Sequence, residues 1–201
     1  MDNQERDRLL RIVRERGLVR PRELRENGIR KDCLLRLYKE GLVDRIGRGL
    51  YAAREADLTE HHSLAVVCKC APQAVVCLLS ALSFHGLTTQ IPHAVWIAVP
   101  AKARRPKVDS VRVEVTWCSG RAFTLGVENH VIEGVSVRVY NPAKTVVDCF
   151  KFRSKVGLDV ALEALRDCLR YRKATADEIW RCAKVCRMAN VMRPYMEAIT
   201  I

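Results

Sequence analysis

The 201-residue chain lacks any long apolar run, and none approaches the roughly 18 residues that a membrane-spanning helix requires. Its first ten residues, MDNQERDRLL, are polar, so they lack the apolar region of a secretion signal. The chain also has no basic tail, Gly/Ser-rich linker, low-complexity tract or internal repeat. These absences argue against a membrane-spanning or exported protein and predict a soluble, cytoplasmic one with no membrane partner.

Metal and disulfide signatures are absent as well. Cys182 and Cys186 lie four residues apart and Cys68 lies two residues from Cys70, but neither pair has a second pair at zinc-site spacing. The nine cysteines are an odd number, and most occur inside apolar stretches such as VVCLL at 75–79. The sequence therefore predicts reduced thiols in the core and no bound metal.

Catalytic motifs are also missing, beginning with the GxxxxGK[ST] phosphate loop. An enzyme would have to use Lys144, Thr145 and Asp148, together with His85, and a single carboxylate is a poor Mg²⁺ site. Lys144 and Asp148 are more simply an i,i+4 ion pair on an exposed helix face. His85, just before Gly86, is more simply a helix-end histidine that bonds carbonyl groups. We therefore expect no cofactor and no catalytic activity of the chain's own.

The chain has an excess of basic residues, with 35 Lys and Arg against 23 Asp and Glu, a net charge of +12 and a pI near 9.5. Such a charge favours polyanionic partners, above all nucleic acid. The excess is spread along the chain, so charge alone does not locate a site. The run KARRPK at 102–107 lies between two predicted strands, and this loop could contact phosphate, an acidic partner or only water.

The first fifty residues contain a recognisable order of elements. Apolar spacing predicts helices over 2–16, 21–26 and 29–40, and period-two patterns predict strands over 42–46 and 50–52. Gly47, Arg48 and Gly49 form the predicted turn between the two strands. Three short helices followed by a hairpin are typical of a winged helix-turn-helix, so we expect such a domain over residues 1–57.

This domain would bind double-stranded DNA because its third helix, 10–12 Å wide like any α-helix, fits the major groove. The candidates for base or groove contacts are Arg30, Lys31 and Arg36, and the candidates for phosphate contacts are Arg22, Lys39, Arg45 and Arg48. Basic residues on a helix are often only its solvated face, however. Asp32, Glu40 and Asp44 would repel phosphate if they faced the duplex.

Residues 58–201 are expected to form a second domain of the α+β class, with a small sheet followed by C-terminal helices. The predicted strands cover 74–77, 95–99, 111–117, 131–134 and 135–140, and the predicted helices cover 64–70, 80–87, 143–152 and 158–170. Thr175 to Glu178 has the pattern of a capping box, which predicts the start of a last helix.

Several segments resemble AbiEi-type antitoxins, the transcriptional regulators of bacterial abortive-infection (viral defence) toxin–antitoxin systems. In the first domain these are GLVRPREL at 17–24, GI at 28–29, LLRLYKEGLV at 34–43 and GRGLY at 47–51. In the second they are LSALSFHGLT at 79–88, PHAVWIA at 92–98 and NPAKTVVD at 141–148. The resemblance extends from about residue 6 to about residue 190.

The resemblance implies a repressor that binds operator repeats in its own operon, with two copies per site, and a second domain that carries antitoxin function. It also implies a cognate toxin resembling a nucleotidyltransferase, in a type IV system where the two proteins need no stable complex. The alternative is a stand-alone winged-helix transcription factor whose second domain is a protein-interaction or catalytic module.

Overall fold

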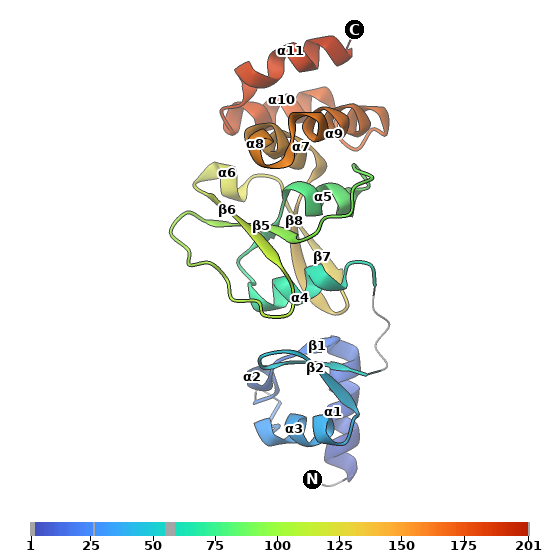
Figure 1. Ribbon diagram of the computed structural model, residues 1–201. Helices are drawn as coiled ribbons and strands as arrows, with labels where there is room; N and C mark the ends of the chain where they lie inside the picture. The colour runs from blue at the N-terminus through green and yellow to red at the C-terminus, as the bar shows by residue number, and fades with distance from the viewer. Residues whose placement is uncertain (1–2, 26, 55–58, 201) are drawn as a thin grey trace. The chain divides into compact units, whose positions relative to one another are not determined.

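The computed structural model describes residues 3–25, 27–54 and 59–200, which form a mixed α+β structure with eleven helices and two sheets (Figure 1). Packing divides the chain into two compact units. The first combines residues 1–72 with 106–111 and 131–137, and the second comprises 73–105, 112–130 and 138–201. The predicted domain boundary after residue 57 falls in the segment 55–58, outside the described residues.

The N-terminal segment contains three helices and a three-stranded sheet. Its elements are α1 (Asn3–Arg16), β1 (Leu18–Val19), α2 (Pro21–Arg25), α3 (Lys31–Lys39), β2 (Val43–Gly47) and β3 (Leu50–Ala53). Gly17 ends α1 in the left-handed region, with φ of +62°, a conformation that glycine adopts without steric cost. The antiparallel sheet has the order β1-β3-β2. The sequence predicted these helices and the hairpin to within about two residues at each end.

Apolar residues at helical and strand spacing form the core of this segment. Each helix turns one apolar stripe inward, as α3 does with Leu34 and Leu37, both 0% exposed. The buried cluster consists of Leu9, Val13, Val19, Leu24, Ile29, Cys33, Leu34, Leu37, Val43, Tyr51 and Ala53. Burial of this stripe leaves the polar side of α3 facing outward.

The second sheet is mixed and has the order β6-β5-β4-β8-β7. After α4 (His62–Cys70), the chain forms β4 (Val75–Val76), α5 (Leu78–His85), β5 (Val95–Pro100), β6 (Val113–Cys118), α6 (Arg121–Thr124), β7 (Val127–Ile132) and β8 (Val135–Tyr140). The central strand β4 pairs antiparallel with β5, where Val76 lies opposite Ile97, and parallel with β8, where Val76 lies opposite Val139. Strand β6 pairs parallel with β5.

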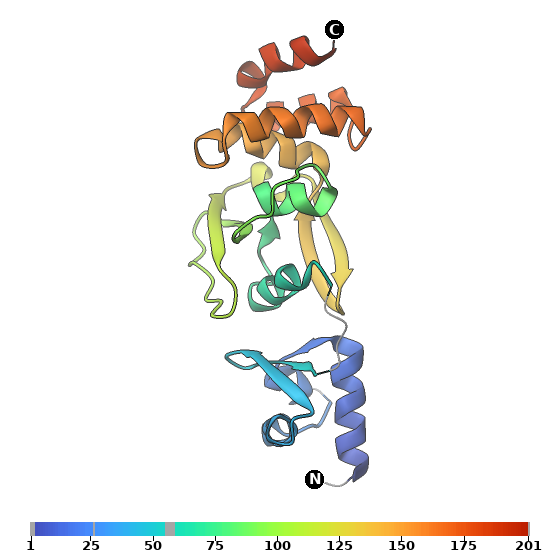
Figure 2. The same cartoon turned by 45° about the vertical axis from the view of Figure 1, so that its right-hand side comes forward.

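The chain ends in a stack of helices, α7 (Pro142–Lys151), α8 (Arg153–Val156), α9 (Leu158–Arg170), α10 (Ala176–Val185) and α11 (Ala189–Thr200). Helix α7 packs against α5, α9 and α10, and α11 lies on the outside of the stack (Figures 1 and 2). The capping box is present, with Thr175 accepting from the amide of Glu178. Helix α10 is not the last, however, because α11 follows it, and this helix was not predicted.

Eight of the nine cysteines are buried and Cys70 is half-buried, which confirms that the thiols lie mainly in the core. Within the described ranges, none of the helices combines the length and the apolarity that crossing a bilayer requires.

Candidate nucleic-acid interface

Helix α3 has a buried side and an outward side. Cys33, Leu34 and Leu37 are at most 5% exposed, whereas Arg36 and Lys39 are exposed. Because 3.6 residues complete each turn, this division leaves one continuous face open along the helix. Tyr38 lies on the exposed side, at 43% exposure, and not on the apolar stripe that the residue spacing suggests.

The start of α3 differs from the sequence prediction. Arg30 is the N-cap residue in an extended conformation, and the helix begins one residue later. The Nη2 atom of Arg30 lies 2.6 Å from Oδ2 of Asp32, and both side chains are exposed. Hydrogen bonding and the charge of the partner raise the pKa of Arg30 and lower that of Asp32. Contact of Arg30 with phosphate would require this ion pair to open. The side chain of Lys31 lies outside the described residues.

The end of α3 is fixed by a glycine. Gly41 has φ of +72°, and its amide donates to the carbonyl of Tyr38 at 3.0 Å. The neighbouring Glu40 carboxylate lies 3.5 Å from Nε of Arg6 on α1. Two of the three acidic residues that argued against DNA binding, Asp32 and Glu40, therefore have cationic partners. The third, Asp44, is exposed on β2.

The hairpin tip carries two of the predicted cations. Arg45 is exposed and its Nε donates to the carbonyl of Gly47 at 3.4 Å, while Arg48 is exposed in the turn. The pairing of β2 with β3 shifts register between Arg45 and Gly47, which marks a bulge. Gly49 has φ of +66°, and none of the described atoms lies within 4 Å of the position of a side chain there, so the tip is open on this side. On the other side, a side chain at Gly47 would lie 3.5 Å from Oγ of Ser110, and Gly47 and Arg48 line a pocket together with Lys107 and Ser110 of the same unit.

Helix α2 contributes Arg22, which is exposed in its first turn. The amide of Arg20 donates to the Glu23 carboxylate at 3.1 Å, and this bond fixes the start of the helix. Helix α3 packs against both α2 and β2, and the Tyr38 ring meets that of Tyr51 on β3 edge-on at 6.3 Å. These contacts hold α2, α3 and the hairpin in one compact unit. Six of the seven predicted site residues are exposed on this unit. The side chain of the seventh, Lys31, lies outside the described residues.

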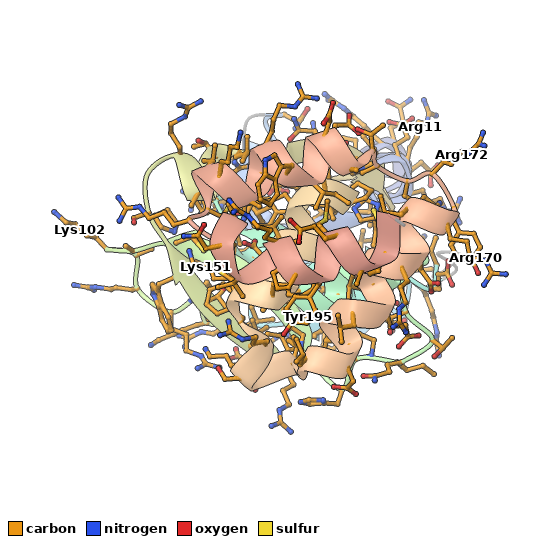
Figure 3. The ribbon with its side chains drawn as sticks, turned by 90° about the horizontal axis from the view of Figure 1, so that it is seen from above. Arg11, Lys102, Lys151, Arg170, Arg172 and Tyr195 are labelled. Carbon is orange, nitrogen blue, oxygen red and sulfur yellow. The ribbon has the colours of Figure 1, made fainter. Side chains whose placement is uncertain are left out.

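The second unit also carries exposed cations, among them Lys102, Lys151, Arg170 and Arg172 (Figure 3). The loop from Lys102 is held to strand β6, because Nη2 of Arg105 donates to the carbonyl of Val113 at 2.6 Å and Nε1 of Trp117 donates to that of Ala103 at 3.1 Å. This loop is an anchored basic segment and remains a weaker candidate contact, since it lies outside any helix or hairpin of groove-binding shape.

The expectation that Lys144 and Asp148 lie on an exposed helix face is wrong. Both side chains are buried in the core, at 0% and 3% exposure, and form an ion pair with each other. Burial alone would lower the pKa of Lys144, but the adjacent Asp148 carboxylate raises it. The Lys144 ammonium also lies 4.1 Å from the centroid of the Tyr140 ring. A pair enclosed in this way has no access to substrate.

His85 behaves as a helix-end histidine. Its Nε2 donates to the carbonyl of Tyr140 at 2.7 Å, linking α5 to β8, and burial lowers its pKa. Among the described residues, no three His, Cys, Asp or Glu side chains are grouped so that they could hold a metal ion.

No protein-family model matches the chain, and no curated protein matches it in sequence. One solved structure with a similar fold is the RV2827C protein from Mycobacterium tuberculosis. The TM-score is 0.60 at 15% sequence identity, and the match covers 90% of this chain and 71% of that one. At this identity the likeness shows a shared fold and nothing about function.

Proposed function

We propose that the N-terminal domain is a winged helix-turn-helix that binds double-stranded DNA. In this proposal α2 and α3 form the helix-turn-helix, α3 enters the major groove, and the β2–β3 hairpin is the wing. Arg36 provides the principal base or groove contact, with further contacts from Lys31 and Arg30 at the start of the helix. The phosphate contacts come from Arg22, Lys39, Arg45 and Arg48.

The observation that carries this proposal is the outward face of α3. Arg36 and Lys39 are exposed along one side of a helix whose other side is fully buried. A rigid, cationic and exposed helix of ordinary width has the shape and the charge that the groove requires. The Glu40 carboxylate, which would repel DNA phosphates, is paired with Arg6 of the same domain.

We further propose that the chain is a cytoplasmic repressor of its own operon and the antitoxin of a type IV abortive-infection system. This part rests on the resemblance to AbiEi-type proteins. Its partners would be operator repeats, bound by two copies of the chain, and a nucleotidyltransferase-like toxin that is countered without a stable complex. The burial of Lys144 and Asp148 favours this role over an independent enzyme, because these residues are the acid–base candidates of the second domain.

A stand-alone transcription factor is the second candidate. The basic loop at 102–105 is held to strand β6 and carries exposed cations. It favours the stand-alone transcription factor, because a second domain with such a segment could recruit an acidic protein partner. The genomic neighbour separates the two candidates. A nucleotidyltransferase-like neighbour whose expression stops growth, and whose effect is reversed by coexpression of this chain, supports the antitoxin. Growth arrest that persists during coexpression contradicts it.

The DNA-binding proposal is tested by selecting duplexes from a random pool on the full chain and measuring their affinity. We expect the double variant Arg36→Ala/Lys31→Ala to bind the selected duplex about tenfold more weakly or worse, since each good contact contributes about 1–3 kcal/mol. The matched control is Arg8→Ala/Arg11→Ala, which removes the same charge from exposed positions of α1. Failure to select any duplex, or equal losses in the two variants, contradicts the proposed interface.

A further inference from the structure

The N-terminal segment exposes two large apolar side chains, and both lie on α3. Among residues 3–25 and 27–54, these are Leu35, 46% exposed, and Tyr38, 43% exposed. The other apolar residues of this helix are buried, with Leu34 and Leu37 at 0%. The exposed apolar surface of this part of the chain is therefore concentrated on the helix that is the proposed reading element.

Leu35 occupies the middle of the outward face. Positions 31 and 39 lie four residues before and after it, so each is about 40° from Leu35 around the helix axis. Tyr38 lies three residues on and Asp32 three residues before, both along the same face, whereas Arg36 is about 100° further around the axis. Leu35 is thus an apolar position with a basic position on each side, and the one acidic neighbour, Asp32, is paired with Arg30.

The orientation of Tyr38 is set by its neighbour. Its ring meets the ring of Tyr51 edge-on at a centroid distance of 6.3 Å, and Tyr51 is itself only 8% exposed. This contact orients Tyr38, which lies three residues from Leu35 on the same face of the helix. We define the apolar patch as Leu35 and Tyr38.

The surrounding charges identify the occupant of this patch. A purely apolar partner would strip water from the neighbouring cations without pairing them, which is costly. The DNA major groove offers phosphates for those cations and one apolar group on the base edges, the C5-methyl of thymine. A leucine at the centre of a cationic helix face matches that combination.

We infer that Leu35, supported by Tyr38, reads the methyl group of a thymine in the bound duplex. This inference rests on the proposed DNA-binding function and adds a specificity-determining residue to it. Lys39 and the other phosphate contacts position the helix, Arg36 contacts a base edge, and the patch makes binding depend on thymine at one or two further base pairs.

The test replaces each thymine of a selected duplex, one at a time, with deoxyuridine, which lacks only the C5-methyl group. The full chain should lose about fourfold in affinity at one or two positions, the effect expected for one buried methyl. Leu35→Ala should bind the thymine duplex more weakly and should no longer respond to deoxyuridine at those positions. Arg36→Ala is the control, since it should bind more weakly but keep the thymine dependence.

Circular dichroism verifies that each variant folds, and Leu35→Met, which keeps an apolar side chain, should retain the thymine dependence. If the wild-type chain binds its selected duplex but no deoxyuridine substitution changes the affinity, the inference is overturned while the proposed function stands. The same holds if Leu35→Ala responds to deoxyuridine as the wild type does, because Leu35 then does not contact the methyl group. If no duplex is selected, both the proposed DNA-binding function and the inference about Leu35 are contradicted.

Discussion

Lys144 forms an ion pair with Asp148 one turn further along α7, and both side chains are enclosed by the core of the second unit. Helix α7 has eight consecutive buried residues, from Ala143 to Phe150, so the pair has no route to solvent along its own helix. Such a pair contributes little net stability compared with apolar residues, but either charge alone would be very costly in this environment.

This relationship predicts a strongly non-additive mutant cycle. Lys144→Met or Asp148→Leu alone should lower the free energy of unfolding by about 3–5 kcal/mol, because each leaves an unpaired buried charge. The double variant Lys144→Met/Asp148→Leu should recover most of that loss. Urea unfolding followed by circular dichroism measures all the variants. Single variants as stable as the wild type, or a double variant as unstable as the two singles combined, would contradict the buried pair.

His85 predicts a dependence of stability on acid. Burial lowers its pKa below the ordinary 6.5, with the Tyr140 carbonyl and Glu128 opposing this effect and His130 and Lys173 adding to it. The unfolded chain therefore binds this proton more readily, so the stability contributed by neutral His85 is present above about pH 6.5. It is lost as the pH falls toward the lowered pKa of the folded state.

The measurement is the urea midpoint of the wild type and of His85→Gln between pH 8 and pH 5. The variant should show a smaller decrease than the wild type. His93→Gln, which removes an exposed imidazole from the loop before β5, controls for the loss of a histidine. Parallel curves for the wild type and His85→Gln would show that His85 does not make this contribution.

Gly126 is predicted to be less replaceable than Gly120, although both have positive φ, at +69° and +56°. A Cβ atom at position 126 would lie 2.8 Å from Oδ1 of Asn141 and 2.8 Å from Cβ of Lys144, whereas none of the described atoms lies within 4 Å at position 120. Both alanine variants bear the cost of a positive φ at a residue with a side chain, about 1–3 kcal/mol. Only Gly126→Ala should lose a further 1–3 kcal/mol, roughly, from the clash at the start of α7. Equal unfolding midpoints would refute this difference.

DNA binding should depend steeply on salt. Each neutralised phosphate contributes about −0.9 to the slope of log K against log salt, so Arg48→Ala should reduce the magnitude of the slope by about that amount. Arg170→Ala, which removes an exposed cation from the second unit, should leave it unchanged (Figure 3). Fluorescence anisotropy between 50 and 300 mM salt, roughly the range over which such slopes are read, provides the data. A flat titration would favour the interaction-module alternative.

The sequence predicted most elements because their signals are local. Glycine often ends a helix, and Gly17, Gly41 and Gly86 each follow a helix directly and have positive φ. Alternating residues located β6 and β8, and Thr175 with Glu178 located the start of α10. The exposed cations of the candidate interface were also predictable, because charged residues on a short amphipathic helix face solvent by default.

The structure differs from the sequence predictions where tertiary packing overrides a local pattern. Helix α11 contains Pro194 in its interior, a residue that argues against a helix and that tertiary contacts accommodate here. Lys144 and Asp148 looked like surface residues because periodicity describes one face of a helix, whereas α5, α9 and α10 cover α7 on several sides. The ring of Tyr38 meets that of Tyr51 on another element, a contact that residue spacing within α3 does not reveal.

The two-residue strand β4 has a consequence for synthesis of the chain. It occupies the centre of the sheet, yet one of its neighbours, β8, is made much later, and Val76 finds Val139 only after that residue has left the ribosome. Until then β4 presents an open edge in the nascent polypeptide, because its other neighbour, β5, is already made. Completion of this sheet is thus a late event in biogenesis.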